Sequence, residues 1–496
     1  MGKVRVLSVL LLSGLLLGAL LLGLGARAAS DVTAMAPQTP APAVQETPLT
    51  STAAYTTYVP LVARYMDSSY HYPFGVITYG SIQSGTELDL LRNAGAYWLT
   101  TSLYWSAIEK TPGVYDWSSF DAKALTAKTA GAELFVLFTS NPTWAAILPG
   151  GPVTDTATLV NFVTRMAERY DGDGIADAPG SPIVNYWSFY AEPDNGDLGR
   201  ALAGKGYFGN TPGLYASMLK SVAPAIHTAN PQAKVLIGGL AYDWFEEDGG
   251  IFVRSFLTDT LSALNDYPGG AAAYIDEVAF HYYPISTLSW PTIREKAIEV
   301  RGILANHQIG DLPLISPEMG YWSSPKWGSS LDSQAYWLVQ MYSRALSQGM
   351  TQLSWYLPKD SAIPESEDDT YPDRTCGLLD IDANPKPAYY AYATMTGQLK
   401  GAHYLRSLSQ TNVVGEVFRL PDGRENAVVW ATALDPALGY TTVSFPYTCL
   451  RRVEIYGTVY APILDGQDGF DYDTISGRIS LGLHETNRPI YVAPCP

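Results

Sequence analysis

The sequence predicts a (β/α)8 barrel followed by a small C-terminal domain of antiparallel strands. Eight short apolar segments occur between residues 73 and 356, and they are separated by stretches that have helix start and stop signals. Buried strands that alternate with helices form a parallel sheet covered by helices, and eight repeats favour closure into a barrel. After about residue 400 the helical pattern ends and short strands with turn residues follow, which is typical of a β-sandwich.

The eight apolar segments have the length and composition of buried strands. In order they are PFGVITYG, YWLTTSLYW, AELFVLFTS, VNYWSFYAEP, KVLIGGLAY, EVAFHYYP, PLISPEMGY and TQLSWYL. Helix candidates between them include residues 86–94 before Gly95, 213–229 before Pro231, 334–347 and 388–399. No GxGxxG motif follows the first segment, which argues against a dinucleotide-binding sheet.

The C-terminal region contains a clear hairpin signal. Residues 413–420 and 427–431 flank Pro421-Asp422-Gly423, a connection with the residues of a tight turn. Further strands are expected at 442–445, 452–456, 478–481 and 489–492. We therefore expect the barrel to span residues 65–399 and the sandwich residues 400–496.

The N-terminus has the pattern of an export signal. Lys3 and Arg5 precede an apolar run that reaches residue 24, and the small-x-small triplet Ala26-Arg27-Ala28 follows. We expect residues 1–28 to be a cleaved signal peptide or an uncleaved membrane anchor, because the apolar run is also long enough to span a bilayer. Residues 29–64, rich in Pro, Thr and Ala, are expected to be a linker. The protein is then secreted or extracytoplasmic, and any membrane contact is through the N-terminus.

Charge and cysteine content narrow the class of partner. The formal net charge is −17, and no basic stripe is present that could neutralise the phosphates of a nucleic acid. A neutral or polar substrate is therefore expected instead of a nucleic acid. Aromatic residues make up 12% of the chain, and their flat faces suit both sugar rings and core packing. The chain has three cysteines, so at least one thiol stays unpaired, and one of the possible pairings is a bridge between Cys449 and Cys495, which both fall in the C-terminal region.

Two carboxylates lie where barrel enzymes place their chemistry. Catalytic side chains of such barrels lie at the C-terminal ends of the strands. The fourth segment ends at Glu192 and the seventh at Glu318, while the sixth ends in FHYYP. A proton donor and a nucleophile are what cleavage of a glycosidic bond requires. For either Glu alone the alternative is a strand-end salt bridge.

Residues 70–400 resemble the clan A retaining glycoside hydrolases, and families 39 and 5 most of all. The resemblance rests on the order of TSLYWSAIEKTPGVYDW, NPTWA, YAEPD, FHYYP, PEMGYW, SWYL and NPKPAYYAY along the chain. It implies a retaining hydrolase of β-glycosides, oligosaccharides or polysaccharides that requires no cofactor.

The resemblance also implies residue roles. Glu192 matches the general acid/base and Glu318 the nucleophile. The sixth-strand Tyr283 matches a tyrosine that hydrogen-bonds the nucleophile, and His281 lies on the same strand face. The implied substrate-binding aromatics are Trp355, as the floor of the sugar site, with Trp105 and Trp144 around the cleft.

Two departures from the clan pattern keep other functions open. Ala191 stands where the clan has an asparagine that bonds the sugar 2-hydroxyl, and the second-strand arginine is replaced by Thr100 or Thr101. Asn195 or Asn141 is expected to compensate, unless the substrate is unusual at that carbon or activity is low. The alternatives are a non-catalytic carbohydrate-binding or surface protein on a degenerate barrel, and a transglycosylase.

One acidic segment resembles the start of a calcium loop. Asp171, Asp173 and Asp177 alternate with glycines just before the fourth strand. No glutamate closes the loop at the twelfth position of an EF-hand. The segment is therefore either a structural calcium site or a solvated acidic turn.

Overall fold

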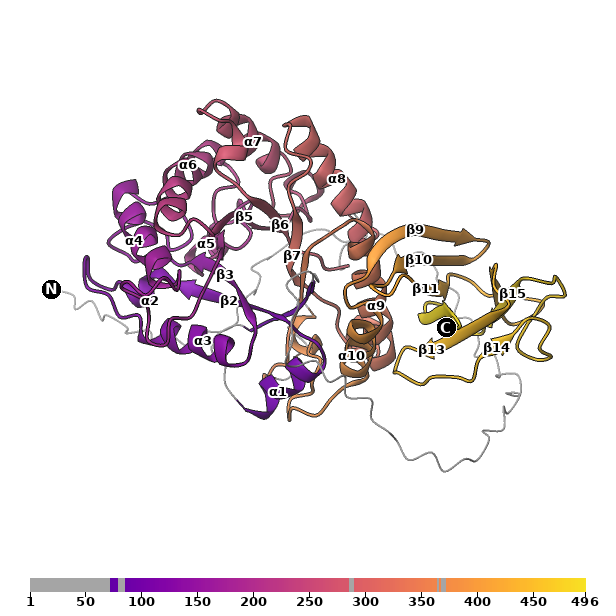
Figure 1. The fold of residues 1–496 in the computed structure, drawn as a ribbon. Coiled ribbons are helices and arrows are strands. Elements are labelled where there is room, and N and C mark those ends of the chain that lie inside the picture. The colour runs from indigo at the N-terminus through magenta and orange to yellow at the C-terminus, as the bar shows by residue number, and fades with distance from the viewer. Residues whose placement is uncertain (1–71, 79–84, 285–289, 364, 367–371) are drawn as a thin grey trace.

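The computed structural model describes residues 72–78, 85–284, 290–363, 365–366 and 372–496. The predicted signal peptide and linker, residues 1–28 and 29–64, lie outside these residues. Among the described residues no helix combines the length and apolarity needed to cross a membrane. The described residues form two folded parts, which Figure 1 shows side by side.

The first part is the predicted barrel. Within the described ranges, parallel strands pair in the order β1 to β8 and close by pairing of β1 with β8 (Figure 1). The strands are β1 (Phe74–Ile77), β2 (Trp98–Tyr104), β3 (Glu133–Thr139), β4 (Tyr186–Phe189), β5 (Lys234–Leu240), β6 (Glu277–Phe280), β7 (Leu314–Met319) and β8 (Gln352–Trp355).

Helices cover the outside of the barrel, except the short α2 and α5, which lie in the loops after β2 and β4. The helices are α1 (Thr86–Asn93), α2 (Trp105–Ile108), α3 (Ser118–Thr129), α4 (Thr156–Arg169), α5 (Leu198–Leu202), α6 (Pro212–Ala229), α7 (Phe256–Asn265), α8 (Ile293–Asn306), α9 (Leu331–Ser347) and α10 (Pro387–Leu399). The helices expected at 86–94, 213–229, 334–347 and 388–399 are confirmed within a few residues at each end.

Side-chain alternation along the strands separates two cores. Phe135, Leu236, Ala279 and Ile315 pack together as a small cluster formed by strands β3, β5, β6 and β7. Their strand neighbours, such as Val136, belong to the much larger cluster that includes the surrounding helices. Because successive side chains of a strand point to opposite faces, one set fills the inside of the barrel and the other packs against the surrounding helices.

The C-terminal part is the predicted sandwich. In the described residues one sheet has the order β14-β13-β16-β11-β10-β9, and β12 pairs with β15 in the other. The strands are β9 (His403–Gln410), β10 (Val413–Arg419), β11 (Glu425–Ala431), β12 (Thr441–Phe445), β13 (Cys449–Glu454), β14 (Ile463–Leu464), β15 (Ile479–Leu483) and β16 (Ile490–Pro494). The predicted hairpin is β10–β11, and a disulfide joins Cys449 to Cys495.

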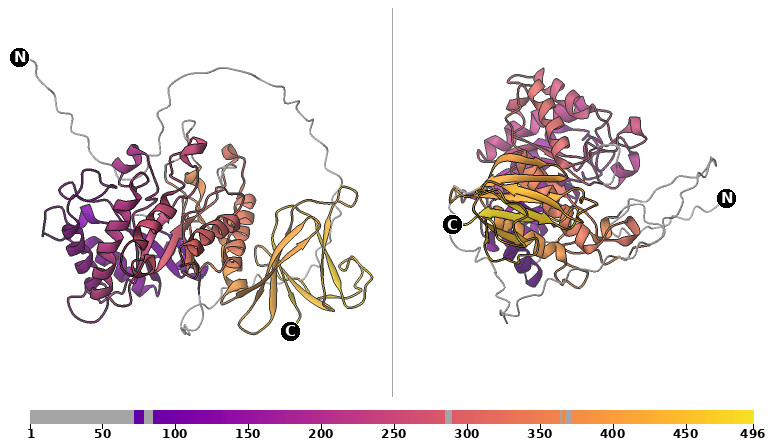
Figure 2. Two further views of the ribbon diagram at one scale, coloured as in Figure 1. Left: turned by 90° about the horizontal axis from the view of Figure 1, so that it is seen from above. Right: turned by 90° about the vertical axis from the view of Figure 1, so that its right-hand side faces the viewer.

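The larger sheet of the sandwich also packs on the barrel. Val429 of β11 lies in the core between the two sheets, whereas Trp430 belongs to the barrel cluster. The guanidinium of Arg344, on α9, lies 5.0 Å from the centre of the Trp430 ring. Arg294 of α8 pairs with the buried Glu416 of β10 at 2.9 Å. Figure 1 and the left view of Figure 2 show the sandwich beside the barrel, next to α9 and α10.

Candidate active site

Glu192 lies in a short turn just after β4 whose backbone is held by its neighbours. Tyr190 and Glu192 both have positive φ, 62° and 53°, a left-handed conformation that side chains other than glycine seldom adopt. The Glu192 N–H donates to the Gly239 carbonyl at 2.8 Å, and the Tyr190 hydroxyl donates to Asn141 Oδ1 at 2.8 Å. Unusual backbone of this kind persists only where surrounding contacts impose it, and it is concentrated at functional sites.

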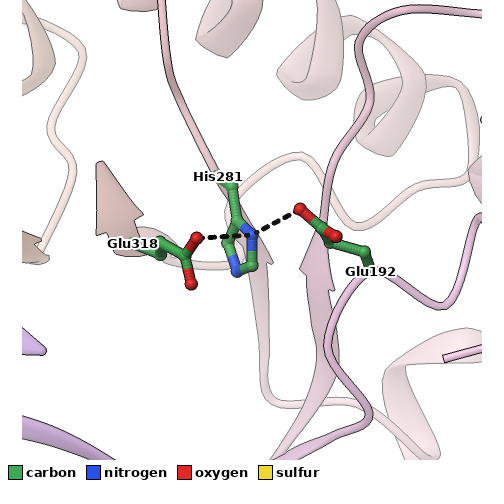
Figure 3. A group of neighbouring side chains, drawn as sticks. All are labelled: Glu192, His281 and Glu318. Atoms are coloured by element: carbon green, nitrogen blue, oxygen red, sulfur yellow. Dashed lines mark hydrogen bonds and ion pairs between the residues drawn. The ribbon is translucent and has the colours of Figure 1, made fainter. Parts of the chain in front are cut away.

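Glu192 and Glu318 meet at one mouth of the barrel, with His281 between them (Figure 3). His281 Nδ1 lies 3.2 Å from Glu192 Oε1 and 3.9 Å from Glu318 Oε1. One oxygen of each carboxylate and one ring nitrogen of His281 all lie within 4.8 Å of one another. On the same strand end as His281, the Tyr283 hydroxyl donates to Glu318 Oε1 at 2.8 Å. The four side chains form one connected cluster.

The imidazole of His281 is buried and stays neutral near pH 7. Burial lowers its pKa to about 4, although the charge of Glu318 opposes this shift. The ring fits because residue 239 is glycine: a Cβ at that position would lie 2.2 Å from His281 Nε2. A neutral imidazole donates only one hydrogen bond, so His281 orients Glu192 without adding a charge beside it.

A buried polar layer holds the strand ends below this cluster. Asp194 accepts hydrogen bonds from the N–H groups of Ala241 and Tyr242, and burial raises its pKa to about 6. Lys296 donates to the carbonyls of Ala241 and His281 at 2.5 and 2.7 Å, and burial lowers its pKa to about 8. These residues tie the ends of β4, β5 and β6 together. Sequence analysis did not identify either of them.

Two basic residues near the carboxylates lie in a segment after β4 that the sequence did not indicate. Arg200, on α5, forms an ion pair with Glu192 Oε2, and its guanidinium lies 5.2 Å from the centre of the Phe252 ring. Lys205 follows α5. Burial lowers the pKa of Lys205, and the nearby charge of Glu318 raises it. In the clan pattern an arginine on the second strand lies near the nucleophile; here Thr100 on β2 instead donates to Ser354 inside the barrel.

Asn195 supports that segment and has no exposed surface for a sugar. Its side-chain amide donates to the carbonyls of Asp197 and Gly206, and its Oδ1 accepts from the Asp197 N–H. The side chain is fully buried. Asn141 is also buried and bonded, to Gly151 and Tyr190. The expectation that either one replaces the missing asparagine beside Ala191 is therefore wrong in this structure.

The expected role of Trp355 is also wrong. Trp355 is fully buried, its indole donates to the Cys376 carbonyl, and its ring stacks on Tyr342 of α9. The reason is strand alternation, because the side chain of Ser354 points into the barrel and that of Trp355 therefore points out. Tyr356 is the next inward-facing residue, and its ring meets that of Tyr283 edge to face at 5.8 Å. Tyr356 is the aromatic side chain that β8 brings to Glu318.

The other two tryptophans pack beneath the loops after β2 and β3. Trp105 is fully buried, and its indole donates to Glu109 at 2.7 Å, so it does not line the cleft as expected. Trp144 is partly buried, contacts the Trp105 ring edge to face, and donates to the Glu109 carbonyl. A sugar contact of Trp144 stays a prediction.

The acidic segment before β4 brings its three aspartates together. One carboxylate oxygen from each of Asp171, Asp173 and Asp177 lies within 4.8 Å of the others. Burial raises the pKa of Asp171, and the neighbouring negative charges add to the shift. The same carboxylates also accept hydrogen bonds from the loop backbone, as a solvated acidic turn would. The calcium site therefore stays a prediction.

Comparisons with known proteins place the fold. No family model matches the sequence, and no curated protein matches it. A solved structure of a family 39 glycoside hydrolase from Bacteroides cellulosilyticus has a TM-score of 0.62 at 19% identity, over 87% of this chain and 82% of that one. A family 39 β-xylosidase from Caulobacter crescentus has a TM-score of 0.56 at 14% identity, over 86% of this chain and 96% of that one. A family 30 endoxylanase from Clostridium papyrosolvens has a TM-score of 0.53 at 13% identity, over 86% of this chain and 97% of that one.

These similarities confirm the barrel that the clan A resemblance implied and the sandwich that the strand pattern after residue 400 predicted. At such identities they establish the fold, because one barrel scaffold supports many chemistries. The chemistry of this chain has to be argued from its own side chains.

Burial of His281 predicts a pH-dependent contribution to stability. Because its folded pKa of about 4 lies below the ordinary 6.5, the unfolded chain binds a proton between these values and the folded chain does not. The stability of the wild type relative to His281→Asn should therefore rise from pH 4 to pH 6.5, by at most about 3 kcal/mol, and then level off. Urea unfolding at several pH values measures this, with His403→Asn as an exposed control. A difference independent of pH would contradict the burial argument.

Calcium binding at the three aspartates predicts a change in thermal stability. A ligand that binds only the folded chain must stabilise it. Added calcium should raise the melting temperature of the wild type and not that of Asp173→Asn, and a chelator should reverse the gain. An equal melting temperature with calcium and with chelator would identify the segment as an acidic turn.

Proposed function

We propose that this chain is an extracytoplasmic glycoside hydrolase that cleaves β-linked glycosides with retention of configuration. The observation that carries the proposal is the pair of carboxylates at one barrel mouth. Oxygens of Glu192 and Glu318 lie within 4.8 Å of each other. Retaining enzymes hold their two carboxyl groups about 5 to 5.5 Å apart, whereas inverting enzymes leave about 6.5 to 9.5 Å for a water molecule.

The contacts of the two carboxylates suit different roles. Glu318 accepts a hydrogen bond from Tyr283, which orients one oxygen and leaves the other to attack the anomeric carbon. Glu192 is held by His281 on the opposite side of the cluster and is the group that donates a proton to the leaving oxygen. After the glycosyl–enzyme bond forms on Glu318, Glu192 takes a proton from the incoming water, and the water oxygen displaces Glu318.

Two further observations support the choice of substrate and compartment. The structural neighbours include a β-xylosidase and an endoxylanase, which favours a β-linked glycan as substrate. The Cys449–Cys495 disulfide favours an oxidising compartment, as does the export signal expected in residues 1–28.

The competing function is a carbohydrate-binding protein on a degenerate barrel. Ala191 and Thr100 favour it, because the clan uses an asparagine and an arginine at these positions. The hydrogen bond between Tyr283 and Glu318 speaks against it, since a binder has no need to orient a nucleophile. A transglycosylase would use the same residues with a sugar hydroxyl in place of water.

Paired substitutions test the assignment of the two carboxylates. On a panel of aryl β-glycosides, Glu318→Ala should abolish turnover, and added azide should restore cleavage with inverted product. Glu192→Ala should slow poor leaving groups far more than activated aryl groups, because only the former need the proton. The loss for poor leaving groups should be about 100-fold or more.

Glu365→Ala serves as the control for these substitutions, since this carboxylate lies in the loop after β8 and bonds Ser324. A binder predicts sugar affinity without turnover, and little change in affinity for either variant. If the wild type binds glycans and cleaves none, the catalytic proposal is contradicted, and Ala191→Asn is the change that should restore turnover on a decayed hydrolase scaffold.

A further inference from the structure

Residues 197–206 form a loop whose two ends are joined by Asn195, and Arg200 of this loop contacts the active site. Asp197 caps α5 by accepting from the Arg200 N–H, and Asn195 bonds both ends of the loop, at Asp197 and at Gly206. The loop is tied to the barrel as well, because Thr139 at the end of β3 donates to the Gly204 carbonyl at 2.6 Å. We call residues 197–206 the cationic loop, since it carries Arg200, which pairs with Glu192, and Lys205, whose pKa the charge of Glu318 raises.

The position of Arg200 conflicts with the proposed first step. An acid that protonates the leaving group must carry a proton, yet an arginine paired with a carboxylate favours its ionised form. Arg200 is largely buried, with 13% of its side chain exposed, and it pairs with Glu192. A negative group on the substrate that attracts the guanidinium away from Glu192 would remove this conflict and let Glu192 hold its proton.

The protonation state of the site leads to the same conclusion. In the first step Glu192 is neutral, so its ion pair with the largely buried Arg200 is weakened. Burial keeps His281 neutral as well. A charge away from water is costly unless it is paired, and an anion of the substrate supplies a pair for the guanidinium of Arg200.

The two basic residues of the cationic loop stand in contrast to the overall charge of the chain. The whole sequence has 31 basic and 48 acidic residues, so the protein as a whole repels anions. The presence of two basic residues on the loop that pairs with Glu192 is therefore a local feature, and not a consequence of overall composition.

On the proposed function, we infer that the substrate is a glycoside with an anionic group, a carboxylate or a sulfate ester, next to the scissile bond. Arg200 and Lys205 bind this group from the cationic loop. In the free enzyme Arg200 pairs with Glu192. When the substrate binds, its anionic group replaces Glu192 as the partner of Arg200, and Glu192 can then hold the proton that cleavage requires. A neutral sugar lacks this effect. Arg200 and Lys205 thus determine the specificity for the anion.

Chemical removal of the anion tests this inference without knowledge of the sugar. Polysaccharides that contain uronic acids are compared with the same samples after their carboxyl groups are reduced to alcohols. Sulfated polysaccharides are compared with desulfated samples. The wild type should cleave the anionic form at least about tenfold faster, as kcat/KM, because a hydrogen bond to a charged group has this strength. The carboxylate and sulfate pairs distinguish the two sources of the anion.

Variants separate anion recognition from a structural role of the loop. Arg200→Gln and Lys205→Gln should reduce the preference for the anionic form to about threefold or less, and Arg200→Lys should restore part of it. Arg406→Gln removes one charge from an exposed ion pair of the sandwich and should keep the full preference. If Arg200 only anchors the loop, Arg200→Gln slows both forms equally and the ratio is unchanged.

Each outcome bears on the inference. A preference for the anionic form that Arg200→Gln abolishes supports it. Equal or faster cleavage of the neutral form overturns it and leaves the proposed hydrolase function intact. Cleavage of no sample in either form overturns both. A preference that survives in both Gln variants would also overturn it, because the anion would then be bound elsewhere.

Discussion

Closure of the barrel is the constraint on which the rest of the structure depends. Pairing of Phe74 with Leu353 joins the first strand to the last, so that all strand ends meet around one mouth. Glu192 and Glu318 are 126 residues apart in the sequence and become neighbours only through this closure. The cost of bringing such distant residues together is met by the buried side chains of the barrel and its helices, not by interactions within the site.

The polar layer at the strand ends converts this closure into a defined site. Lys296 and Asp194 use buried charges to bond backbone groups of β5 and β6, so the turns that carry Glu192 and His281 cannot shift independently. Such groups are costly to bury unless their hydrogen bonds are made. Burial of Lys296 and Asp194 therefore costs stability, and their hydrogen bonds fix the strand ends that carry the site.

The architecture, and the position of Glu192 and Glu318 at one mouth of the barrel, could be predicted from the sequence because each rests on a local pattern. Apolar segments of strand length marked the barrel, and Glu192 and Glu318 were found because each lies at the end of such a segment. The error at Trp355 was avoidable in principle: Gln352 and Ser354 are polar residues that alternate with Leu353 and Trp355, so parity alone places the tryptophan outside the barrel. Arg200 and Lys205 carried no such signal. They reach the site through a loop whose path depends on contacts with Asn195 and Thr139, which no local pattern predicts.

The central claim is that Glu192 and Glu318 act together as a retaining pair. Proton NMR of the first product formed from any substrate that the protein cleaves tests it most directly, because the anomeric signals are read before mutarotation mixes them. The account predicts that the first product has the same anomeric configuration as the substrate. A product of inverted configuration would contradict it, and so would turnover that persists undiminished in Glu318→Ala.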